Sequence, residues 1–172
     1  MQREAESPGA FAIRPASADD LRFVHEMLYE AAFWRPGAPR PAASSRPLDA
    51  PELAVYVENW GRRGDRALIA AQEELLLGAA WYRLFTEQSR GHGFVNTETP
   101  ELGVAVTAAH RGRGVGSALV AAAMAQAALD GFGQLSLSVE PDNPAAGLYA
   151  RLGFERFSTP LRSWTMVAAT SR

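Results

Sequence analysis

Apolar residues recur every three or four positions in several separate stretches of the chain. These stretches cover residues 21–34, 50–61, 114–130 and 143–152, and their spacing predicts about four helices. The first stretch follows Ser17-Ala-Asp-Asp20, which has the chemistry of a helix N-cap, and ends near Trp34. In the last stretch we expect Asn143 to be the N-cap and Pro144 the first helical residue.

Shorter apolar segments lie between these helices and predict strands. They cover residues 10–14, 66–72, 75–85, 101–106, 135–139 and 163–168. Two polar stretches that contain proline or glycine, residues 35–47 and 86–100, predict long loops. Strands that alternate with helices indicate an α/β (or α+β) domain, in which helices cover the faces of one sheet.

Length, composition and charge narrow the class of protein. The 172 residues suit one domain, which we expect at 10–172 after a disordered tail at 1–9. The chain has no cysteine, which excludes a cysteine nucleophile, and no His, Asp or Glu cluster has metal-ligand spacing. A net charge of −2 gives no basic footprint for nucleic acid. No apolar run reaches membrane-spanning length, so we expect a cytoplasmic protein with neither nucleic-acid nor membrane partners.

The most informative motif is the glycine-rich sequence Arg111-Gly-Arg-Gly-Val-Gly116. It lies between an expected strand and an expected helix, where glycine lets the backbone adopt positive φ and approach a ligand closely. The free N–H groups at the start of a helix bind phosphate, and the two arginines add positive charge. We therefore expect a phosphate or pyrophosphate to bind Arg111, Gly112, Arg113, Gly114, Val115, Gly116 and Ser117.

Two other phosphate-binding patterns fit this motif poorly. The dinucleotide pattern G-x-G-x-x-G matches Gly112 and Gly114, but Ser117 stands at its third glycine. Residues 107–111 also separate the expected strand from the first glycine, whereas a dinucleotide turn follows its strand directly. The Walker A pattern requires a lysine, and the chain has none. An NAD-binding domain is therefore disfavoured.

The motif resembles the acyl-CoA loop of the GNAT family of N-acetyltransferases, Q/R-x-x-G-x-G/A, through Arg111, Gly114 and Gly116. Downstream residues resemble the Asn/Ala/Tyr/Gly-Phe pattern of that family: Asn143, Ala146, Tyr149, Gly153 and Phe154. The resemblance is close over residues 100–155, and elsewhere it concerns the order of elements. It implies a central, mixed, mostly antiparallel sheet of six to seven strands, splayed between its two central strands and flanked by about four helices.

The resemblance also implies an activity, the transfer of an acetyl group from acetyl-CoA to an amine by direct attack in a ternary complex. Backbone groups of Val104, Ala105 and Val106 would pair with the pantetheine arm of the cofactor. Tyr149 would give a proton or hydrogen bond to the departing thiolate, since its hydroxyl stays protonated at neutral pH. Ala146 would leave space for the cofactor, and Asn143 would contact it in addition to capping the helix.

An amine acceptor must lose a proton before it attacks, which calls for a general base. Glu101 precedes Arg111 by ten residues, as the base does in some members of the family. Glu98, His92 or a water molecule are the alternatives. A non-catalytic acyl-CoA-binding or regulatory domain of the same fold is the alternative function, and the resemblance also allows a homodimer.

The resemblance leaves the acceptor open between a small-molecule amine and a peptide or protein amine. In the family, the acceptor is held by the loop between the first two helices and the loop between the last strands, here residues 35–47 and 158–162. We also expect Tyr82, Arg83 and Phe85 to line the acceptor cleft.

Overall fold

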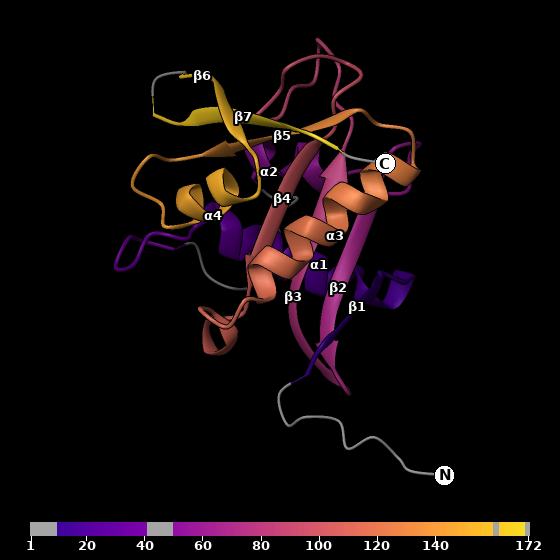
Figure 1. The fold of residues 1–172 in the computed structure, drawn as a ribbon, viewed down its shortest axis with the longest axis vertical. Helices are drawn as coiled ribbons and strands as arrows, with labels where there is room; N and C mark the ends of the chain where they lie inside the picture. The colour runs from indigo at the N-terminus through magenta and orange to yellow at the C-terminus, as the bar shows by residue number, and fades with distance from the viewer. Residues whose placement is uncertain (1–9, 41–49, 160–161, 171–172) are drawn as a thin grey trace.

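The computed structural model describes residues 10–40, 50–159 and 162–170 (Figure 1). The expected tail at 1–9 lies outside these ranges, as do residues 41–47 and 160–161 of the two expected acceptor loops. Within the described ranges there are four α-helices: α1 (Leu21–Ala32), α2 (Pro51–Val57), α3 (Val115–Leu129) and α4 (Ala145–Arg151). None of the helices in the described ranges is both long and apolar enough to cross a bilayer.

In the part of the chain that the structure describes, seven strands form one sheet in the order β1-β2-β3-β4-β5-β7-β6. Their bounds are β1 (Ala12–Pro15), β2 (Arg66–Gln72), β3 (Leu75–Arg83), β4 (Glu101–Val106), β5 (Gln134–Val139), β6 (Glu155–Ser158) and β7 (Trp164–Ala169). Every neighbouring pair is antiparallel except β4 and β5, which run parallel. The expected mixed, mostly antiparallel sheet with about four helices is therefore confirmed.

The helices cover both faces of the sheet and make two cores. On one face, α3 and α4 pack through Leu119, Val120 and Tyr149 against inward residues of the strands. On the other face, α1 and α2 pack through residues such as Val24 and Leu53. Adjacent residues of one strand point to opposite cores, as expected for the two-residue period of a strand. Both faces of β2 and β3 are largely buried, which explains the almost continuous apolar sequences of these two strands.

One strand and the bounds of several elements differ from the sequence expectation. Strand β6 was not predicted, because all four of its residues are exposed at the sheet edge and show no alternation. Helix α2 ends at Val57 rather than near residue 61, because the buried Arg83 guanidinium donates to the carbonyl groups of Val55 and Glu58. Helix α4 begins at Ala145, yet the Asn143 side chain still accepts from the Ala145 N–H at 2.9 Å.

The two central strands diverge soon after they meet. Glu101 and Ser136 are the paired positions of β4 and β5, and the Ser136 N–H donates to Pro100 at 3.0 Å. On the other side, β4 pairs with β3 along its whole length. The expected splay between the central strands is therefore confirmed, and it opens one edge of β4 along the second half of that strand.

Candidate active site

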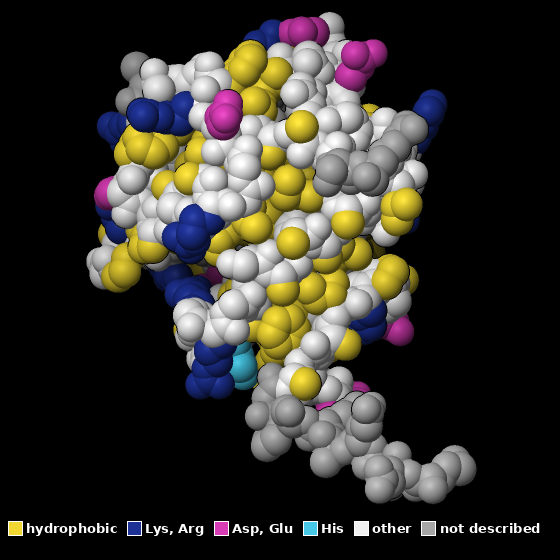
Figure 2. All heavy atoms as spheres, viewed as in Figure 1, with side chains coloured by type: hydrophobic (Ala, Val, Ile, Leu, Met, Phe, Trp, Pro, Cys, Tyr) yellow, Lys and Arg dark blue, Asp and Glu magenta, His cyan; other side chains and the backbone are white. Residues whose placement is uncertain are grey.

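A cleft of about 670 Å³ occupies the space where β4 and β5 separate. Four regions line it: the end of α1 and the residues after it, strand β4, the glycine-rich loop, and the end of β5 with α4. The lining residues are Glu30, Ala31, Trp34, Pro36, residues 102–106, His110, Arg111, Gly112, Gly114, Gly116, Ser117, Ser138, Val139, residues 143–145, Leu148, Tyr149 and Arg151. Figure 2 shows basic side chains and a histidine around the glycine-rich loop on the face in view.

The backbone of β4 presents hydrogen-bonding groups to this cleft. The Thr107 N–H donates to Leu77 of β3 at 2.8 Å. In an antiparallel pair, backbone groups of alternate residues point toward the partner strand and away from it. Given the register, those of Leu102, Val104 and Val106 point away from β3 and toward the cleft. Ala105 lines the cleft, but its own N–H and C=O pair with Ala79 of β3.

Two glycines of the loop adopt left-handed backbone conformations before α3 begins. Gly112 has φ of 71° and Gly114 has φ of 83°, values that side-chain-bearing residues rarely adopt. A methyl group at either position would contact nothing within 4 Å, so the conformation and not the space requires glycine. Of the expected phosphate-binding residues, Val115 is buried in the core and Arg113 is exposed outside the cleft lining. Any contribution from these two residues would come from their backbone.

Arg111 is held at the mouth of the cleft by two contacts. Its Nε donates to the Val106 carbonyl at 3.0 Å, and its guanidinium pairs with Glu30 of α1 at 2.9 Å. Arg40 pairs with the same carboxylate at 3.1 Å. The Val106 carbonyl, expected to pair with a pantetheine arm, therefore already accepts a hydrogen bond in this structure.

Tyr149 lines the cleft from α4. Its ring packs edge-on against Phe154, with centroids 5.9 Å apart. Burial raises the pKa of the hydroxyl above its usual value, so the group stays protonated at neutral pH. Within the described residues, no hydrogen bond engages this hydroxyl, which leaves it available as a donor. Ala145 and Ala146 both pack against the core, but of the two only Ala145, four residues before Tyr149, also lines the cleft.

Glu101 lies at the start of β4, beside the cleft but not in its lining. Its side chain is buried, and Oε1 accepts from the Tyr56 hydroxyl of α2 at 2.9 Å. Its Oε2 has no hydrogen-bond partner of normal geometry among the described residues, although the Gly93 backbone lies near enough to favour the ionised form. Burial outweighs both contacts and raises the pKa of Glu101 to about 7. A carboxyl group of this kind exchanges protons near neutral pH.

The two alternative bases lie in different surroundings. His92 is exposed, and its Nδ1 lies 3.0 Å from the Tyr56 hydroxyl, so it joins Glu101 through that tyrosine. Glu98 lines a different pocket. Tyr56 was not among the expected site residues, because no motif spacing links this tyrosine to a carboxylate 45 residues later.

Three residues expected in the acceptor cleft lie elsewhere. Arg83 is buried and pairs with Asp65 at 2.7 Å. Tyr82 is buried, and its hydroxyl donates to Asp130 at 2.5 Å. Phe85 packs edge-on against Tyr56, with ring centroids 5.3 Å apart, and does not line the cleft. The expectation for these residues was wrong, because the residues with which they pair are distant in the sequence.

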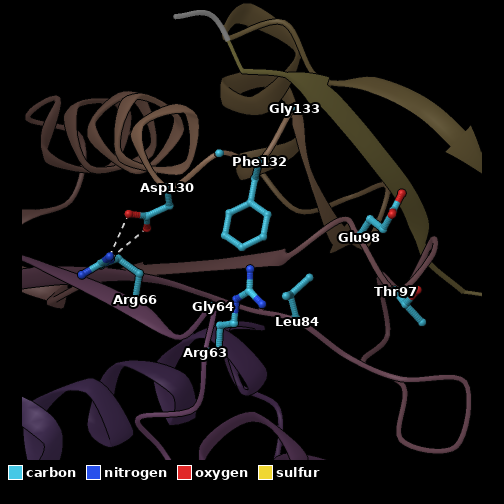
Figure 3. A pocket seen from close by; sticks show the side chains of 10 residues that line it. Arg63, Gly64, Arg66, Leu84, Thr97, Glu98, Asp130, Phe132 and Gly133 are labelled. Carbon is cyan, nitrogen blue, oxygen red and sulfur yellow. Dashed lines mark hydrogen bonds and ion pairs between the residues drawn. The ribbon is translucent and has the colours of Figure 1, made fainter.

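A second pocket, of about 740 Å³, lies near the C-terminal end of α3 (Figure 3). Arg66 and Asp130 form the ion pair drawn there, and the Asp130 carboxylate also accepts from Tyr82 and Gln126. Arg63 and Glu98 contribute charged side chains to its wall. Its volume exceeds that of the cleft, but its central carboxylate is already satisfied by three partners. Volume alone therefore does not identify the reactive site.

Two segments far apart in sequence meet across the rim of the cleft. The Arg35 guanidinium pairs with Glu140 and with Asp142, each at 2.6 Å. The Trp34 indole N–H donates to Glu140 at 3.1 Å, and the guanidinium lies over the Trp34 ring. We call this group the rim clasp; it joins the segment after α1 to the segment before α4. Among the described residues, no group of three His, Cys, Asp or Glu is arranged to hold a metal ion.

Several solved structures resemble this chain in fold. No curated protein matches the chain in sequence. Among solved structures, YncA of Salmonella typhimurium with its cofactor acetyl-CoA is 22% identical, with a TM-score of 0.69 and coverage of 95% of both chains. The ribosomal-protein-alanine N-acetyltransferase of Brucella melitensis is 24% identical, with a TM-score of 0.66 and coverage of 92% of this chain and 99% of that one.

A third solved structure is the PaiA N-acetyltransferase of Thermoplasma acidophilum in complex with coenzyme A. It is 18% identical, with a TM-score of 0.68 and coverage of 93% of this chain and 99% of that one. At these identities, the likeness establishes the fold. The sequence itself matches the acetyltransferase (GNAT) family over residues 26–154, three quarters of its length. This chain therefore belongs to the GNAT acetyltransferase family.

Proposed function

We propose that this chain transfers an acetyl group from acetyl-CoA to an amine acceptor within a ternary complex. One observation carries the proposal: a single cleft combines the open edge of β4, the left-handed glycine loop and the Tyr149 hydroxyl. The strand edge suits the pantetheine arm of acyl-CoA, the glycine loop suits its pyrophosphate, and the hydroxyl suits its sulfur. The acetyl-CoA and coenzyme A in the names of two related structures support the same donor.

The chain would hold the donor mainly through its backbone. N–H and C=O groups of Val104 and Val106 would pair with the amide groups of the pantetheine arm, with Arg111 releasing the Val106 carbonyl. N–H groups of residues 112–117 would bind the pyrophosphate at the start of α3. When bound, acetyl-CoA supplies an acetyl group activated as a thioester. Asn143 and Ala145 would form the facing wall.

Three groups of the chain would act in the reaction: a base, a donor to the acyl oxygen and a donor to the departing sulfur. Glu101, with a pKa of about 7, would take the proton of the acceptor ammonium directly or through water. A cleft-facing N–H of β4 would stabilise the negative charge that develops on the acyl oxygen. Tyr149 would donate to the departing sulfur, because its hydroxyl is protonated and free of other hydrogen bonds within the described residues.

The acceptor that we propose is a small-molecule amine or a peptide or protein amine. The name of one related structure specifies a ribosomal-protein alanine, which supports including an N-terminal amine among the candidates. We also propose that this chain is cytoplasmic and forms a homodimer.

Ligand-dependent thermal unfolding tests the donor. At a hundred times Kd, acetyl-CoA adds about 2.7 kcal/mol to the free energy of unfolding. For a chain of this length, this corresponds to a rise in Tm of roughly 5–10 °C. NAD is the control and should give no rise. No rise with saturating acetyl-CoA would overturn the donor assignment.

Turnover then tests the reaction. Release of free CoA should be followed with a panel of amines that includes an alanine-initiated peptide, a polyamine and free amino acids. We expect at least one acceptor to release CoA at a rate proportional to enzyme concentration. Acetyl-CoA binding without turnover on any amine would instead favour a non-catalytic acyl-CoA-binding domain.

A further inference from the structure

A chain of hydrogen-bonding groups leads from the buried Glu101 to the protein surface. Oε1 of Glu101 accepts from the Tyr56 hydroxyl at 2.9 Å. The same hydroxyl oxygen lies 3.0 Å from Nδ1 of His92 and accepts from the His92 backbone N–H at 2.8 Å. Tyr56 is buried, whereas His92 is exposed. Only one side chain therefore separates the carboxylate from a solvent-exposed imidazole.

The loop that carries His92 is held tightly against the sheet. A Cβ at Gly91 would lie 2.0 Å from Glu101 Oε2, and a Cβ at Gly93 would lie 2.6 Å from the Leu137 carbonyl carbon of β5. Glycine is therefore required on both sides of His92 by close approach. The imidazole also stacks on the Tyr56 ring, with an angle of 6° between the rings and 6.1 Å between their centroids. This packing fixes the imidazole beside the hydroxyl.

We propose that Tyr56 and His92 form a proton relay that returns Glu101 to its ionised state after each turnover. The inference rests on the proposed function, because it assumes that Glu101 takes a proton from the acceptor. Tyr56 and His92 act here as positioning and relay residues and do not touch the substrate. The cleft would be filled by both substrates during the reaction, so a route on the other side of Glu101 gives the proton an independent exit.

The transfer balances in protons at every step. Protonated Glu101 donates its proton to the Tyr56 oxygen while the Tyr56 proton moves to Nδ1 of neutral His92. Both shifts are concerted, because burial raises the pKa of Tyr56 far above its usual range and disfavours a free tyrosinate. The imidazolium then releases its Nε2 proton to solvent, which leaves an Nδ1–H group that donates to Tyr56. Tautomer exchange with water resets the imidazole for the next cycle.

The other polar groups near Glu101 do not offer this route. Arg83 is its cross-strand neighbour on β3, but that guanidinium is engaged by Asp65. Ser136 is its partner on β5, and the Ser136 Oγ is fully buried without a hydrogen-bond partner among the described residues. From the remaining side, Phe85 is apolar and packs on Tyr56. In the described part of the chain, the path through Tyr56 is the one that ends at an exposed titratable group.

The tautomer of His92 tests the hydrogen-bond chain without any substrate. When Glu101 is ionised, Tyr56 donates to it and must accept from His92, so His92 should carry its proton on Nδ1. Nitrogen chemical shifts of the imidazole in mildly alkaline solution report this directly. In Tyr56→Phe, we expect His92 to shift toward the Nε2–H form that free imidazole side chains prefer. Tyr82→Phe, which also removes a buried hydroxyl donating to a carboxylate, is the matched control and should leave His92 unchanged. An Nε2–H form in the unmodified protein under conditions where Glu101 is ionised would overturn the relay.

Turnover with the acceptor found in the panel tests proton transfer itself. At low buffer concentration, His92→Ala should lower kcat by about tenfold or more while the Kd for acetyl-CoA stays unchanged. Added imidazole should restore kcat, because a small base can occupy the exposed position. In Tyr56→Phe, imidazole should not restore kcat, because the gap next to Glu101 remains. His25→Ala is the control, since His25 lies outside the relay and the cleft lining.

The outcomes separate the relay from the proposed function. If His92→Ala turns over like the unmodified enzyme at every buffer concentration, the relay is wrong and the acetyltransferase assignment stands. If the unmodified enzyme acetylates no amine, the proposed function fails, and the relay falls with it because it returns no catalytic proton. In that case an Nδ1–H tautomer would leave Tyr56 and His92 with a structural role only.

Discussion

Asp65 and Glu101 are both buried carboxylates, yet their surroundings differ completely. Asp65 accepts two hydrogen bonds from the Arg83 guanidinium, at 2.8 and 2.7 Å. It also accepts from the backbone N–H groups of Gly61 and Arg62. Among the described residues, Glu101 faces no cation in direct contact and accepts one side-chain hydrogen bond, from Tyr56. Hydrogen bonds and an ion pair replace the hydration of the Asp65 carboxylate. The Glu101 carboxyl group, whose pKa is about 7, is present in both protonation states near neutral pH.

This difference separates a structural group from a reactive one. A buried charge is tolerated when a partner and hydrogen bonds replace its hydration. The Arg83–Asp65 pair meets that condition and also ends α2, which carries Tyr56. Glu101 does not meet it, so its pKa rises to about 7. The Arg83–Asp65 ion pair therefore holds α2 in place, and α2 carries the Tyr56 hydroxyl that donates to Glu101.

The largest expected effect is on stability, from removal of the satisfied carboxylate. Asp65→Ala leaves the Arg83 guanidinium buried without its partner, which should lower the free energy of unfolding by about 3–5 kcal/mol. Urea denaturation measures this loss. Glu155→Ala, at an exposed position of β6, is the control and should change stability by no more than about 0.5 kcal/mol. A loss below about 1 kcal/mol in Asp65→Ala would contradict our description of the pair.

Removal of the Glu101 carboxyl group should raise the free energy of unfolding instead of lowering it. The folded pKa of Glu101, about 7, lies above the reference value of 4.5, so the native state loses stability as pH rises between these values. Glu101→Gln lacks this titration and should exceed the unmodified protein in stability by up to about 3 kcal/mol in alkaline solution. The difference in Tm should shrink on acidification to about pH 4. A difference independent of pH would show that Glu101 titrates normally.

The same titration should appear in the rate. If Glu101 is the base, kcat should rise about tenfold for each pH unit below about pH 7 and level off above it. Initial rates at saturating acetyl-CoA and acceptor measure the profile. Glu101→Gln should abolish the rise of kcat with pH below about pH 7, as well as most of the activity. If this rise persists in the variant, another group produces it.

Tyr149 is also buried but, unlike the two carboxylates, it stays protonated at neutral pH. Tyr149→Phe removes the proton donor but keeps the ring against Phe154. We expect kcat to fall at least tenfold, about 1.4 kcal/mol of barrier, with the Kd for acetyl-CoA unchanged. Calorimetry measures the binding and free CoA measures the turnover. Unchanged turnover would remove Tyr149 from the donor role.

The smallest effect concerns the exposed carboxylates of the rim clasp. Glu140 and Asp142 share the Arg35 guanidinium in contact with water, where ion pairs contribute little. Arg35→Ala should leave Tm unchanged and should speed acetyl-CoA release modestly, because the clasp joins two walls of the cleft. Stopped-flow dissociation measures this, with Arg22→Ala as the control for loss of an exposed ion pair on α1. Slower release in Arg35→Ala would contradict a retaining role.

Local signals predicted one part of the molecule well. Helices α1, α2 and α4 and six of the strands follow apolar periodicity, whereas α3 is apolar on almost all sides; the glycine-rich loop begins α3 as expected. The exposed strand β6 escaped notice because an edge strand without a buried face shows no alternation. Arg83 was misassigned because an arginine at the end of a strand has the same local pattern whether it faces solvent or a buried carboxylate. Only the turn that carries Asp65 distinguishes the two cases.

By itself, the sequence determined the helices, six of the seven strands, the left-handed glycine loop and the position of Tyr149 on a short helix beyond it. These features depend on neighbours within a few residues, because backbone preference and helix periodicity are local properties. The tertiary structure alone decided how strongly Glu101 holds a proton. That property depends on Tyr56, 45 residues earlier, and on the glycine-flanked loop that covers the carboxylate. Burial is a property of packing between distant segments, and no spacing in the sequence encodes it.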